Sequence, residues 1–370
     1  MRTPMVVLVV ICFVVAAGAS RNLAHGAPPG DSTAALQARF DQLKPGETLN
    51  LEPGTYQHSG EIYIRVPGVQ IDGNGATLQA TNDPTSAVWV TADNVTVSNL
   101  NLTAPQGGPR QDSTDRSKLV VGANGVTLRD VTITGSSSVG VFIGGAKNFR
   151  LDRVTVRDTR ADGIQITAGS SDGEINDSTT ERTGDDGFAV LGYSEQKLGY
   201  HSEPCRNITI NSPVVHGTTW SRGIVVAGGE DIHIHNISVS NTSLAGVFIA
   251  AVGDPFFMQS SNGVEVTGGT VTGANMTPGF PMGAVTVSSD YAGHGVANAV
   301  ISDLTITDTA PTANGNVTLE ATNGGFLNKV VLRNIHIQQR SDLPAVHAEA
   351  PGHSFALSGF TMNGNMIDVP

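Results

Sequence analysis

The chain lacks the residues that build the core of most large enzymes. Aromatic residues make up only 5% of its 370 residues, whereas glycine occurs 44 times. Cysteine is almost absent: Cys12 lies in an apolar N-terminal run, and removal of that run leaves Cys205 without an internal disulfide partner. We therefore expect a fold with many turns and few bulky side chains, stabilised by something other than disulfides.

Positive charge is also scarce. Lysine and arginine number 21 against 33 aspartate and glutamate residues, so the formal net charge is −12, and the basic residues form no cluster. This balance argues against nucleic acids and anionic membrane surfaces as partners.

The N-terminus resembles a secretory signal. Arg2 precedes an apolar run from Met5 to Val15, and the small residues that follow offer a cleavage site at Ala17-Gly-Ala19. The apolar run is too short to span a bilayer as a stable helix. We interpret residues 1–20 as a signal peptide and predict a secreted or cell-envelope protein with no membrane anchor after cleavage.

One repeated phrase occupies most of the chain, and it pairs two short alternating strands with a bend between them. Examples are Gly125-Val-Thr-Leu-Arg-Asp-Val-Thr-Ile, Asn148-Phe-Arg-Leu-Asp-Arg-Val-Thr-Val and Asp231-Ile-His-Ile-His-Asn-Ile-Ser-Val. About ten residues later comes a third strand that begins after a glycine. Successive glycines lie 23 (140 to 163), 24 (163 to 187), 36 (187 to 223) and 23 (223 to 246) residues apart. Three short strands per repeat predict the coil of a parallel β-helix, an all-β fold with apolar side chains stacked inside.

A single helix is predicted, about residues 32–43, with Asp31 or Ser32 as its N-cap. Its apolar face consists of Leu36, Phe40 and Leu43. We expect this helix to cap the open end of one β-helix domain that covers residues 28–370.

After this helix come the phrases Pro53-Gly-Thr-Tyr and Ile71-Asp-Gly-Asn-Gly. A short helix followed by these two phrases resembles the opening of the pectin-lyase-like right-handed β-helix proteins. The resemblance implies a single-domain right-handed parallel β-helix with three short strands per coil.

Three successive repeats carry a charged residue immediately before the glycine of the third strand. Asp162-Gly-Ile-Gln-Ile, Asp186-Gly-Phe-Ala-Val and Arg222-Gly-Ile-Val-Val align without a gap. Neighbouring strands lie about 4.8 Å apart, so these charged side chains should lie within reach of one another, with Asp185 beside them. Crowded carboxylates raise at least one pKa and retain a proton near neutral pH. Glycoside hydrolysis requires such a proton on its general acid.

Asp-Gly is also a common turn pair, because Asp accepts local backbone hydrogen bonds and Gly tolerates positive φ. Two such pairs in register, one doubled to Asp185–Asp186 and followed by Arg222, are harder to explain as turns. We therefore interpret Asp162, Asp185, Asp186 and Arg222 as catalytic.

This stretch resembles the polygalacturonases of glycoside hydrolase family 28. Their strands carry Asn-Thr-Asp-Gly-x-Asp, then Asp-Asp-Cys-x-Ala-Ile, then Gly-His-Gly, then Arg-Ile-Lys. Asp162 matches the leading aspartate of the first motif, and Asp185-Asp186-Gly-Phe-Ala-Val matches the second. The resemblance implies that Asp185 is the general acid, while Asp162 and Asp186 hold and activate the water of an inverting hydrolysis.

The departures from that family concern its uronate-binding residues. Gln165 replaces the second aspartate of the first motif, and Arg222 stands where Gly-His-Gly places its histidine. The segment Gly246-Val-Phe-Ile stands where Arg-Ile-Lys would bind galacturonate. We expect a hydrolase without a cofactor whose substrate is a polysaccharide other than pectin.

An insertion at residues 192–204 follows the second aspartate strand and offers aromatic and polar side chains for a glycan cleft, since aromatic faces stack on sugar rings. The predicted substrate-binding residues are Gln165, Tyr193, Lys197, Tyr200, His201 and Trp220. The segment Gly253–Met258 is a candidate for a further wall.

Two other classes of function fit the same charged residues at the start of the third strands. In a calcium-dependent polysaccharide lyase, Asp162 and Asp186 would bind the metal and Arg222 would abstract a proton, and a related epimerase would use the same base. A lyase has no need of the doubled Asp185–Asp186, which favours the hydrolase. The third class is a non-catalytic glycan-binding or surface β-helix. Because strand edges pair internally, we expect a monomer.

Overall fold

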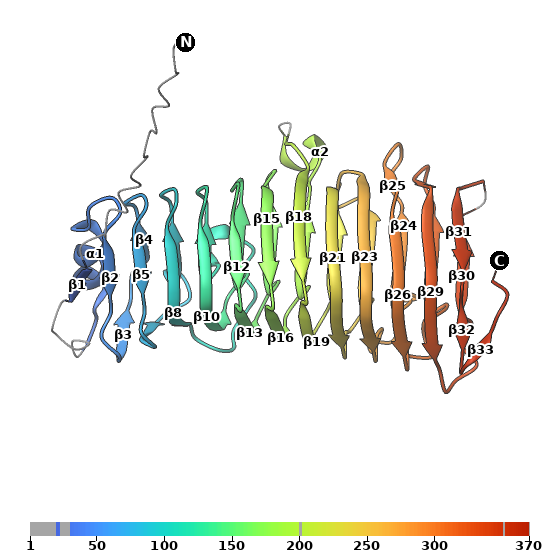
Figure 1. Ribbon diagram of the computed structural model, residues 1–370, viewed down its shortest axis with the longest axis horizontal. Helices are drawn as coiled ribbons and strands as arrows, with labels where there is room; N and C mark the ends of the chain where they lie inside the picture. The colour runs from blue at the N-terminus through green and yellow to red at the C-terminus, as the bar shows by residue number, and fades with distance from the viewer. Residues whose placement is uncertain (1–19, 23–29, 200–201, 351, 370) are drawn as a thin grey trace, which may run out of the picture.

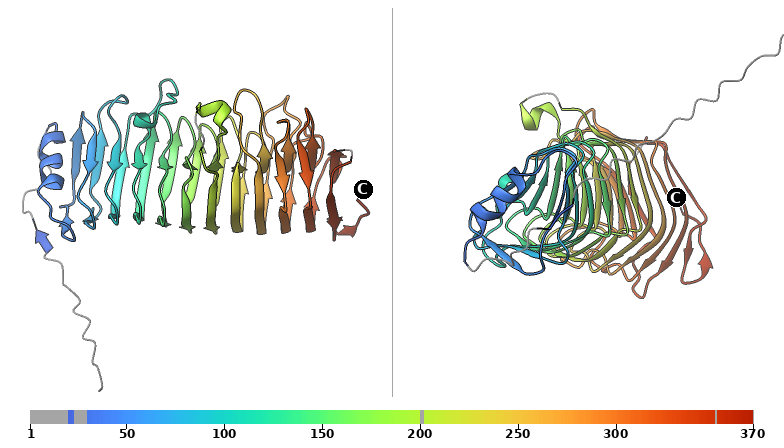
Figure 2. Two further views of the ribbon diagram at one scale, coloured as in Figure 1. Left: turned by 90° about the horizontal axis from the view of Figure 1, so that it is seen from above. Right: turned by 60° about the vertical axis from the view of Figure 1, so that its left-hand side comes forward.

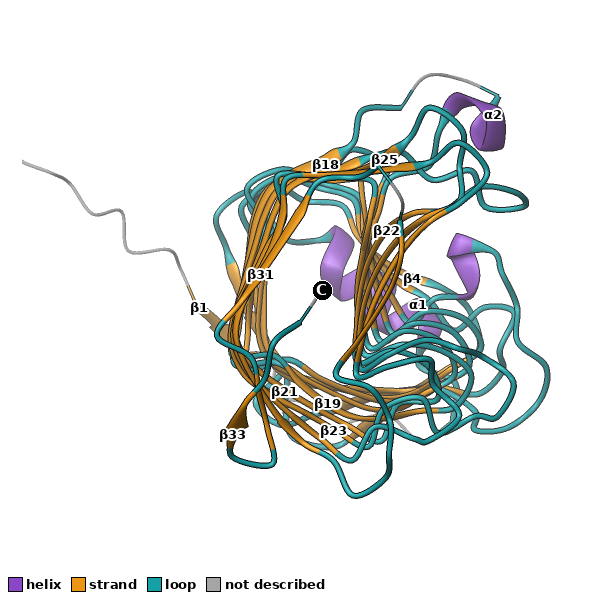
Figure 3. Cartoon of the chain, turned by 90° about the vertical axis from the view of Figure 1, so that its right-hand side faces the viewer, coloured by secondary structure: helices purple, strands orange, loops and turns teal. Residues whose placement is uncertain are grey.

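The computed structural model describes residues 20–22, 30–199, 202–350 and 352–369. The chain winds into one elongated parallel β-helix, as predicted, with its coils side by side along the long axis (Figure 1). Seen down that axis, the strands enclose a single interior (Figure 3). Except for Ser20, the predicted signal peptide lies outside the described residues.

One face of the β-helix is a parallel sheet that has 11 strands in the described part of the chain. From the N-terminal coil onward these are β4 (Ile62–Ile64), β7 (Val88–Val90), β9 (Leu119–Val121), β11 (Val141–Gly144), β14 (Ile164–Thr167), β17 (Phe188–Leu191), β20 (Ile224–Ala227), β22 (Val247–Ala251), β24 (Val285–Ser289), β27 (Val317–Ala321) and β30 (Val346–Glu349). We call this face the 11-stranded sheet.

The other two faces merge into one sheet of 22 described strands, parallel except for the pair β32–β33. Its strands are β1 (Ser20–Asn22), β2 (Thr48–Asn50), β3 (Thr55–His58), β5 (Gln70–Asp72), β6 (Thr77–Ala80), β8 (Thr96–Thr103), β10 (Thr127–Ser136), β12 (Arg150–Asp152), β13 (Thr155–Thr159), β15 (Ser171–Asn176), β16 (Thr179–Thr183), β18 (Cys205–Asn211), β19 (Val214–Thr218), β21 (Gly229–Ser240), β23 (Ser261–Thr272), β25 (Gly295–Ala297), β26 (Val300–Thr307), β28 (Phe326–Asn328), β29 (Val330–Gln338), β31 (Phe355–Ser358), β32 (Thr361–Met362) and β33 (Asn365–Met366).

The bend inside each repeated phrase is a residue in the left-handed region. Asp130 has φ 53°, Asn236 has φ 56° and Asp303 has φ 60°, so β10, β21 and β26 continue through the bend from one face to the next. Asn and Asp tolerate this conformation better than other residues with a side chain. The recurrent Asn and Asp of the phrase therefore mark the corners of the coil.

Alternation along each strand fills the interior. Ile164 and Ile166 of β14 point into the core and are 0% and 1% exposed, whereas Gln165 between them lies on the outer face. In the next two coils Phe188 and Ile224 stand in register with Ile164. The stacked side chains form one continuous core along the helix.

Helix α1 (Thr33–Asp41) lies within the range predicted for the cap and packs against β3 and β4 at the end of the coils. Leu36 and Phe40 are each 1% exposed, so burial of the apolar face holds the helix in place. Ser32 is the N-cap residue, but the side chain that binds the first turn belongs to Asp31, whose Oδ1 accepts a hydrogen bond from the Thr33 amide at 2.9 Å. No described helix has the length and apolarity needed to cross a membrane.

Two further short helices lie in loops: the 3-10 helix η1 (Thr114–Arg116) and α2 (Glu195–Leu198). Both project from the same side of the molecule, outside the 11-stranded sheet (Figures 2 and 3). The insertions that carry these two helices therefore flank the 11-stranded sheet. This sheet contains the strands that directly follow the predicted catalytic residues.

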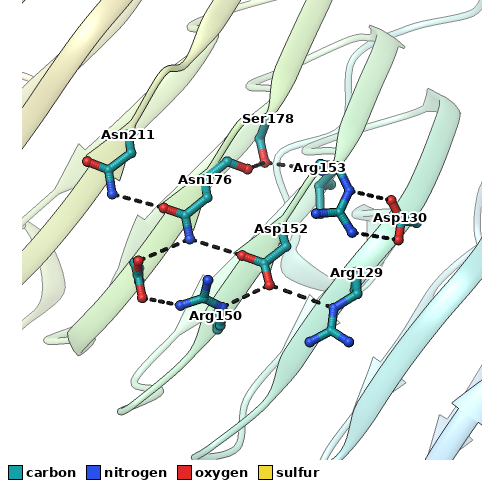
Figure 4. Close-up of polar contacts among 10 residues, drawn as sticks. Arg129, Asp130, Arg150, Asp152, Arg153, Asn176, Ser178 and Asn211 are labelled. Atoms are coloured by element: carbon teal, nitrogen blue, oxygen red, sulfur yellow. Dashed lines mark hydrogen bonds and ion pairs between the residues drawn. The ribbon is translucent and has the colours of Figure 1, made fainter.

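The 22-stranded sheet carries a row of paired charges on its outer surface, which we call the surface ladder (Figure 4). Its members are Arg129, Asp130, Arg150, Asp152, Arg153, Asn176 and Asn211. Asp152 accepts hydrogen bonds from Arg150 at 2.8 Å and from Asn176 at 3.0 Å. The bond from Asn176 joins β15 to β12, one coil to the next, on the outer surface, whereas the bond from Arg150 lies within β12.

Candidate active site

The predicted catalytic aspartates meet where the chain enters the 11-stranded sheet. Gly163 N donates to the backbone oxygen of Asp186 at 2.8 Å, and Gly187 N donates to that of Arg222 at 3.0 Å. These bonds place Asp162, Asp186 and Arg222 in one column, as predicted. One carboxylate oxygen from each of Asp162, Asp185 and Asp186 lies within 4.8 Å of the others.

The glycine after each charged residue is required by packing. A Cβ on Gly163 would lie 2.6 Å from Thr180 Cγ2 and 2.7 Å from the Gly187 oxygen, closer than atoms pack. The strand therefore starts at a position without a side chain, and the residue before it carries the charged side chain at the corner of the coil.

Asp186 is the most constrained of the three carboxylates. It is 3% exposed, and Arg222 binds it through Nε to Oδ1 at 2.9 Å and Nη2 to Oδ2 at 3.2 Å. The guanidinium of Arg222 also lies 4.9 Å from the ring centre of Phe248. Phe248 belongs to β22 and lies on the outer face of the 11-stranded sheet. Asp162 is 6% exposed, and its Oδ1 accepts a hydrogen bond from the Asp186 amide at 3.1 Å.

The pKa values of these carboxylates follow from their surroundings. Burial raises the pKa of Asp162 well above its usual 3.8, and the charges of Asp186 and Asp185 raise it further. Burial also raises the pKa of Asp186, although Arg222 acts against the shift. Crowding alone predicted such a shift from the sequence, whereas the structure shows that burial is the larger cause.

Tyr193 lies beside the aspartates, in agreement with its predicted place. Burial, and then the charges of Asp162, Asp186 and Asp185, raise the pKa of its hydroxyl. Its side chain packs against the outer face of the 11-stranded sheet, near Phe248. Gln165 lies on that same outer face and is 9% exposed.

The remaining predicted binding residues have different positions. Lys197 in α2 donates to the Pro255 oxygen at 2.9 Å and lies 5.9 Å from the ring centre of Phe256, so its amine joins two loops. Trp220, two residues before Arg222, is 73% exposed. Tyr200 and His201 lie outside the described residues.

The segment predicted as a further wall packs against the insertion at 192–204. The Ser194 amide donates to the Phe257 oxygen at 2.8 Å, and Gln259 Nε2 donates to the Tyr193 oxygen at 3.0 Å. These two loops form one body on the C-terminal side of the aspartates.

The sequence reasoning missed Arg110. Its Nη1 donates to Asp185 Oδ2, and its Nε donates to Asp112 at 2.7 Å. Asp185 is the most accessible of the three carboxylates, with a side chain that is 22% exposed. The only signal in the sequence was the polar insertion that interrupts the repeat between β8 and β9.

A surface pocket of about 480 Å³ lies elsewhere, on the outer face of the 22-stranded sheet. It is lined by Gln57, Gln79, Ala80, Thr81, Thr103, Ala104, Pro105, Gln106 and Thr134. None of the four predicted catalytic residues lines it.

The aspartate oxygens are of the kind that calcium prefers, but arginines already hold three of the six. Both oxygens of Asp186 accept from Arg222, and Oδ2 of Asp185 accepts from Arg110. A calcium ion bound to Asp186 would have to displace Arg222 from both carboxylate oxygens.

Comparison with solved structures identifies the fold. The catalytic unit of a thermostable family 87 α-1,3-glucanase from Streptomyces thermodiastaticus matches 95% of this chain and 70% of its own, with 19% identity and a TM-score of 0.64. The A-module of a mannuronan C-5 epimerase from Azotobacter vinelandii matches 91% of this chain and 96% of its own, with 18% identity and a TM-score of 0.63. A surface adhesin of Streptococcus pneumoniae matches 90% of this chain and 88% of its own, with 13% identity and a TM-score of 0.58.

Two further glucanase catalytic domains, with TM-scores of 0.64 and 0.55 and identities of 13% and 14%, carry alanine in place of one or the other of two consecutive aspartates. Both are complexes with tetrasaccharides. A search of curated proteins finds no match.

The strand order and these structural matches define the protein as a right-handed parallel β-helix. The model of the family described as "Right handed beta helix region" matches residues 66–277, more than half of the chain, and the protein belongs to that family. The finer resemblance to polygalacturonases stays a prediction.

Proposed function

We propose that the protein is a secreted inverting glycoside hydrolase that cleaves a polysaccharide with Asp162, Asp185 and Asp186. The observation that carries the proposal is the cluster of three carboxylates with one oxygen of each within 4.8 Å of the others, in which Asp162 and Asp186 are buried and have raised pKa values. A general acid and a water-activating base need neighbouring carboxyl groups in different protonation states.

The roles follow from access. Asp185 is the carboxyl that a glycosidic oxygen can reach, so we assign it as the general acid. Asp162 and Asp186 are too buried to meet a sugar ring, but a water molecule is small enough to bind between them and the anomeric carbon.

The stereochemical proposal rests on burial. One oxygen from each of the three carboxylates lies within 4.8 Å of the others, closer than the ~6.5–9.5 Å typical of an inverting carboxyl pair. A retaining enzyme, however, needs a carboxylate that attacks the anomeric carbon directly. Asp186 has both oxygens bound to Arg222, and Asp162 is covered, so neither is placed as a nucleophile.

A neutral glycan is the substrate class that the charges favour. Around the aspartates, in the described part of the chain, Arg222 is bound to Asp186 and Arg110 to Asp185 and Asp112. Lys197 is bound to a backbone oxygen. A uronate carboxylate would therefore meet three carboxylates and cations that already have partners.

The same contacts argue against the lyase and the epimerase. Both mechanisms require Arg222 to accept a proton, and so to lose its own first. Burial alone would lower the pKa of Arg222, but its bonds to Asp186 outweigh burial, and the net shift is upward. An arginine held in this way is a charge partner and not a base.

The test is to incubate the protein with a panel of neutral and uronic polysaccharides, with and without chelator, and to measure both reducing ends and the absorbance of unsaturated products. We expect reducing ends from a neutral glycan, unaffected by chelator, with an inverted first-formed anomer in proton NMR. Chelator-sensitive absorbance would assign the site to a lyase. Binding without any product would support the role of an adhesin or another glycan-binding protein.

A further inference from the structure

The insertion between β8 and β9 reaches across the coils to the active site. It leaves the 22-stranded sheet after Thr103 and enters the 11-stranded sheet at Leu119. Along the way the Gln111 amide donates to the Ser137 oxygen at 2.8 Å, and Ser137 Oγ donates to the Arg116 oxygen at 3.1 Å. The insertion is therefore docked on the coils at several points.

Arg160 is the strongest of these anchors, and it belongs to the catalytic segment, two residues before Asp162. Its Nη1 and Nη2 donate to the two carboxylate oxygens of Asp83 at 2.7 and 2.9 Å. The same groups donate to the backbone oxygens of Pro109 at 3.0 Å and Pro105 at 2.9 Å. The side chains of Arg160 and Asp83 are only 10% and 17% exposed, so this pair is screened little by water.

Pro109 directly precedes Arg110, so the anchor fixes the start of the arginine side chain. Asp112 then holds the Nε edge of the guanidinium at 2.7 Å, and the Nη1 edge meets Asp185. A guanidinium is a planar fork, and hydrogen bonds to two carboxylates restrict its rotation.

Asp185 depends on this contact more than its neighbours do. Arg222 fixes the Asp186 carboxylate, and the Asp186 amide fixes Asp162. In the described residues, the single hydrogen bond to the Asp185 carboxylate comes from Arg110. A guanidinium can only donate, so Oδ2 is held as an acceptor and Oδ1 is left to carry the proton for the glycosidic oxygen.

We propose that Arg110 is a positioning residue that orients Asp185 for proton donation, and that the Asp83–Arg160 pair holds the loop that supplies it. This inference rests on the proposed hydrolase function and adds a second charged group, contributed from a different part of the chain. It also gives a role to an arginine that stands at the edge of the site already paired with Asp185 and Asp112.

The experiment compares Arg110→Ala and Arg110→Lys with Arg182→Ala as a matched control. Arg182, three residues before Asp185, makes a similar two-bond pair with Asp158 on the 22-stranded sheet, at 2.8 and 3.1 Å, and in the described residues it bonds to none of the three aspartates. We expect Arg110→Ala to lower kcat about 10- to 100-fold while KM changes less than about threefold, since a displaced catalytic group lowers kcat. Lysine should restore part of the loss, because it keeps the charge without the fork.

Two further measurements separate positioning from a structural role. Added guanidine should restore part of the activity of Arg110→Ala and none to a variant that lacks Asp185. Hydrogen exchange of residues 104–117 should increase in Asp83→Asn but not in Arg110→Ala, because Arg160 still anchors the loop. Thermal unfolding checks that every variant is folded.

The outcomes distinguish the two proposals. If Asp185→Asn abolishes activity but Arg110→Ala leaves kcat unchanged, the positioning role is wrong and the hydrolase stands. A rise in kcat/KM for Arg110→Ala would make Arg110 an obstruction to substrate, which also overturns the inference. If the wild-type protein is inactive on all glycans, the hydrolase proposal is wrong, and so is any catalytic role for Arg110. The hydrogen-exchange measurement would still decide whether the Asp83–Arg160 pair anchors the loop.

Discussion

Asp152 of the surface ladder and Asp162 of the active site are equally accessible, at 6% exposure each, yet their pKa values shift in opposite directions. For Asp152 burial acts to raise the pKa, but hydrogen bonds from Arg150 and Asn176 outweigh it, and the net shift is downward. For Asp162 burial raises the pKa, and the neighbouring carboxylates Asp186 and Asp185 add to the shift. Neighbours, and not exposed area alone, separate a structural aspartate from a reactive one.

The two regions also differ in the balance between carboxylates and arginines. In the surface ladder Asp152 faces both Arg150 and Arg129, the latter at 3.8 Å. At the active site three carboxylates share Arg222 and Arg110. An excess of buried carboxylates over arginines favours retention of a proton. In the surface ladder each carboxylate has a cationic or amide partner, and some of these pairs join neighbouring strands (Figure 4).

The largest expected effect comes from replacing the proposed acid. Asp185→Asn should lower kcat by about 10²- to 10⁴-fold, the usual contribution of general acid catalysis. Asp152→Asn, the same change in the surface ladder, should leave kcat within about twofold. Initial rates of reducing-end release measure both, and equal losses in the two variants would remove the distinction between the regions.

The second effect concerns stability. Arg222→Ala leaves Asp186, whose side chain is 4% exposed, without its partner, and we expect a loss of about 3–5 kcal/mol in the free energy of unfolding. Arg153→Ala breaks the exposed pair with Asp130 and should cost about 0–1 kcal/mol. Urea unfolding gives both values. Adding Asp186→Asn to Arg222→Ala should recover part of the loss; a further loss would contradict the charge argument.

The third effect is a pair of opposite pH dependences. The raised pKa of Asp162 means that the folded state binds more protons than the unfolded state above about pH 3.8, so ionisation costs stability as pH rises. Asp162→Asn should therefore gain stability over the wild type as pH rises from 4 to 7. Asp152 has a lowered pKa, so Asp152→Asn should be less stable than the wild type above about pH 3.8, and the difference should shrink as pH falls below that value. Unfolding midpoints against pH that run in the same direction would refute the comparison.

The smallest effect is on binding. Trp220 is exposed, two residues before Arg222. Stacking of its ring on a sugar would contribute about 0.5–1.5 kcal/mol, so Trp220→Ala should raise KM about 2- to 10-fold and leave kcat nearly unchanged. Met366→Ala is the control, because Met366 is 72% exposed but lies in β33 at the C-terminal end. An unchanged KM would place the glycan elsewhere than beside Trp220.

Much of the site could be predicted because it is part of the repeat. Parallel pairing with a constant coil places residues one repeat apart side by side, so the column of Asp162, Asp186 and Arg222 follows from counting residues. The outward direction of Gln165 follows from strand alternation in the same way. Periodic backbone hydrogen bonding brings residues that are one repeat apart in the sequence into contact in space.

Contacts outside the repeat could not be predicted in this way. Arg110 and Asp185 are 75 residues apart, and the loop that joins them follows no period. Lys118 is a second case: it occupies the coil position of Gly140 and points into the core, where its amine donates to the Ser86 oxygen at 2.8 Å and burial lowers its pKa to about 7. A buried lysine is tolerated there because a partner is in place, which the local sequence does not reveal.

The chain's own pattern of strands, bends and glycines thus establishes the β-helix and the row of charges at its corner, because each coil repeats the hydrogen bonds of the one before. The depth at which each carboxylate lies, and the arginine that meets Asp185 from an aperiodic loop, follow only from three-dimensional packing. Burial and charge pairing depend on every neighbour within a few ångströms, and those neighbours come from coils and loops far apart in the chain.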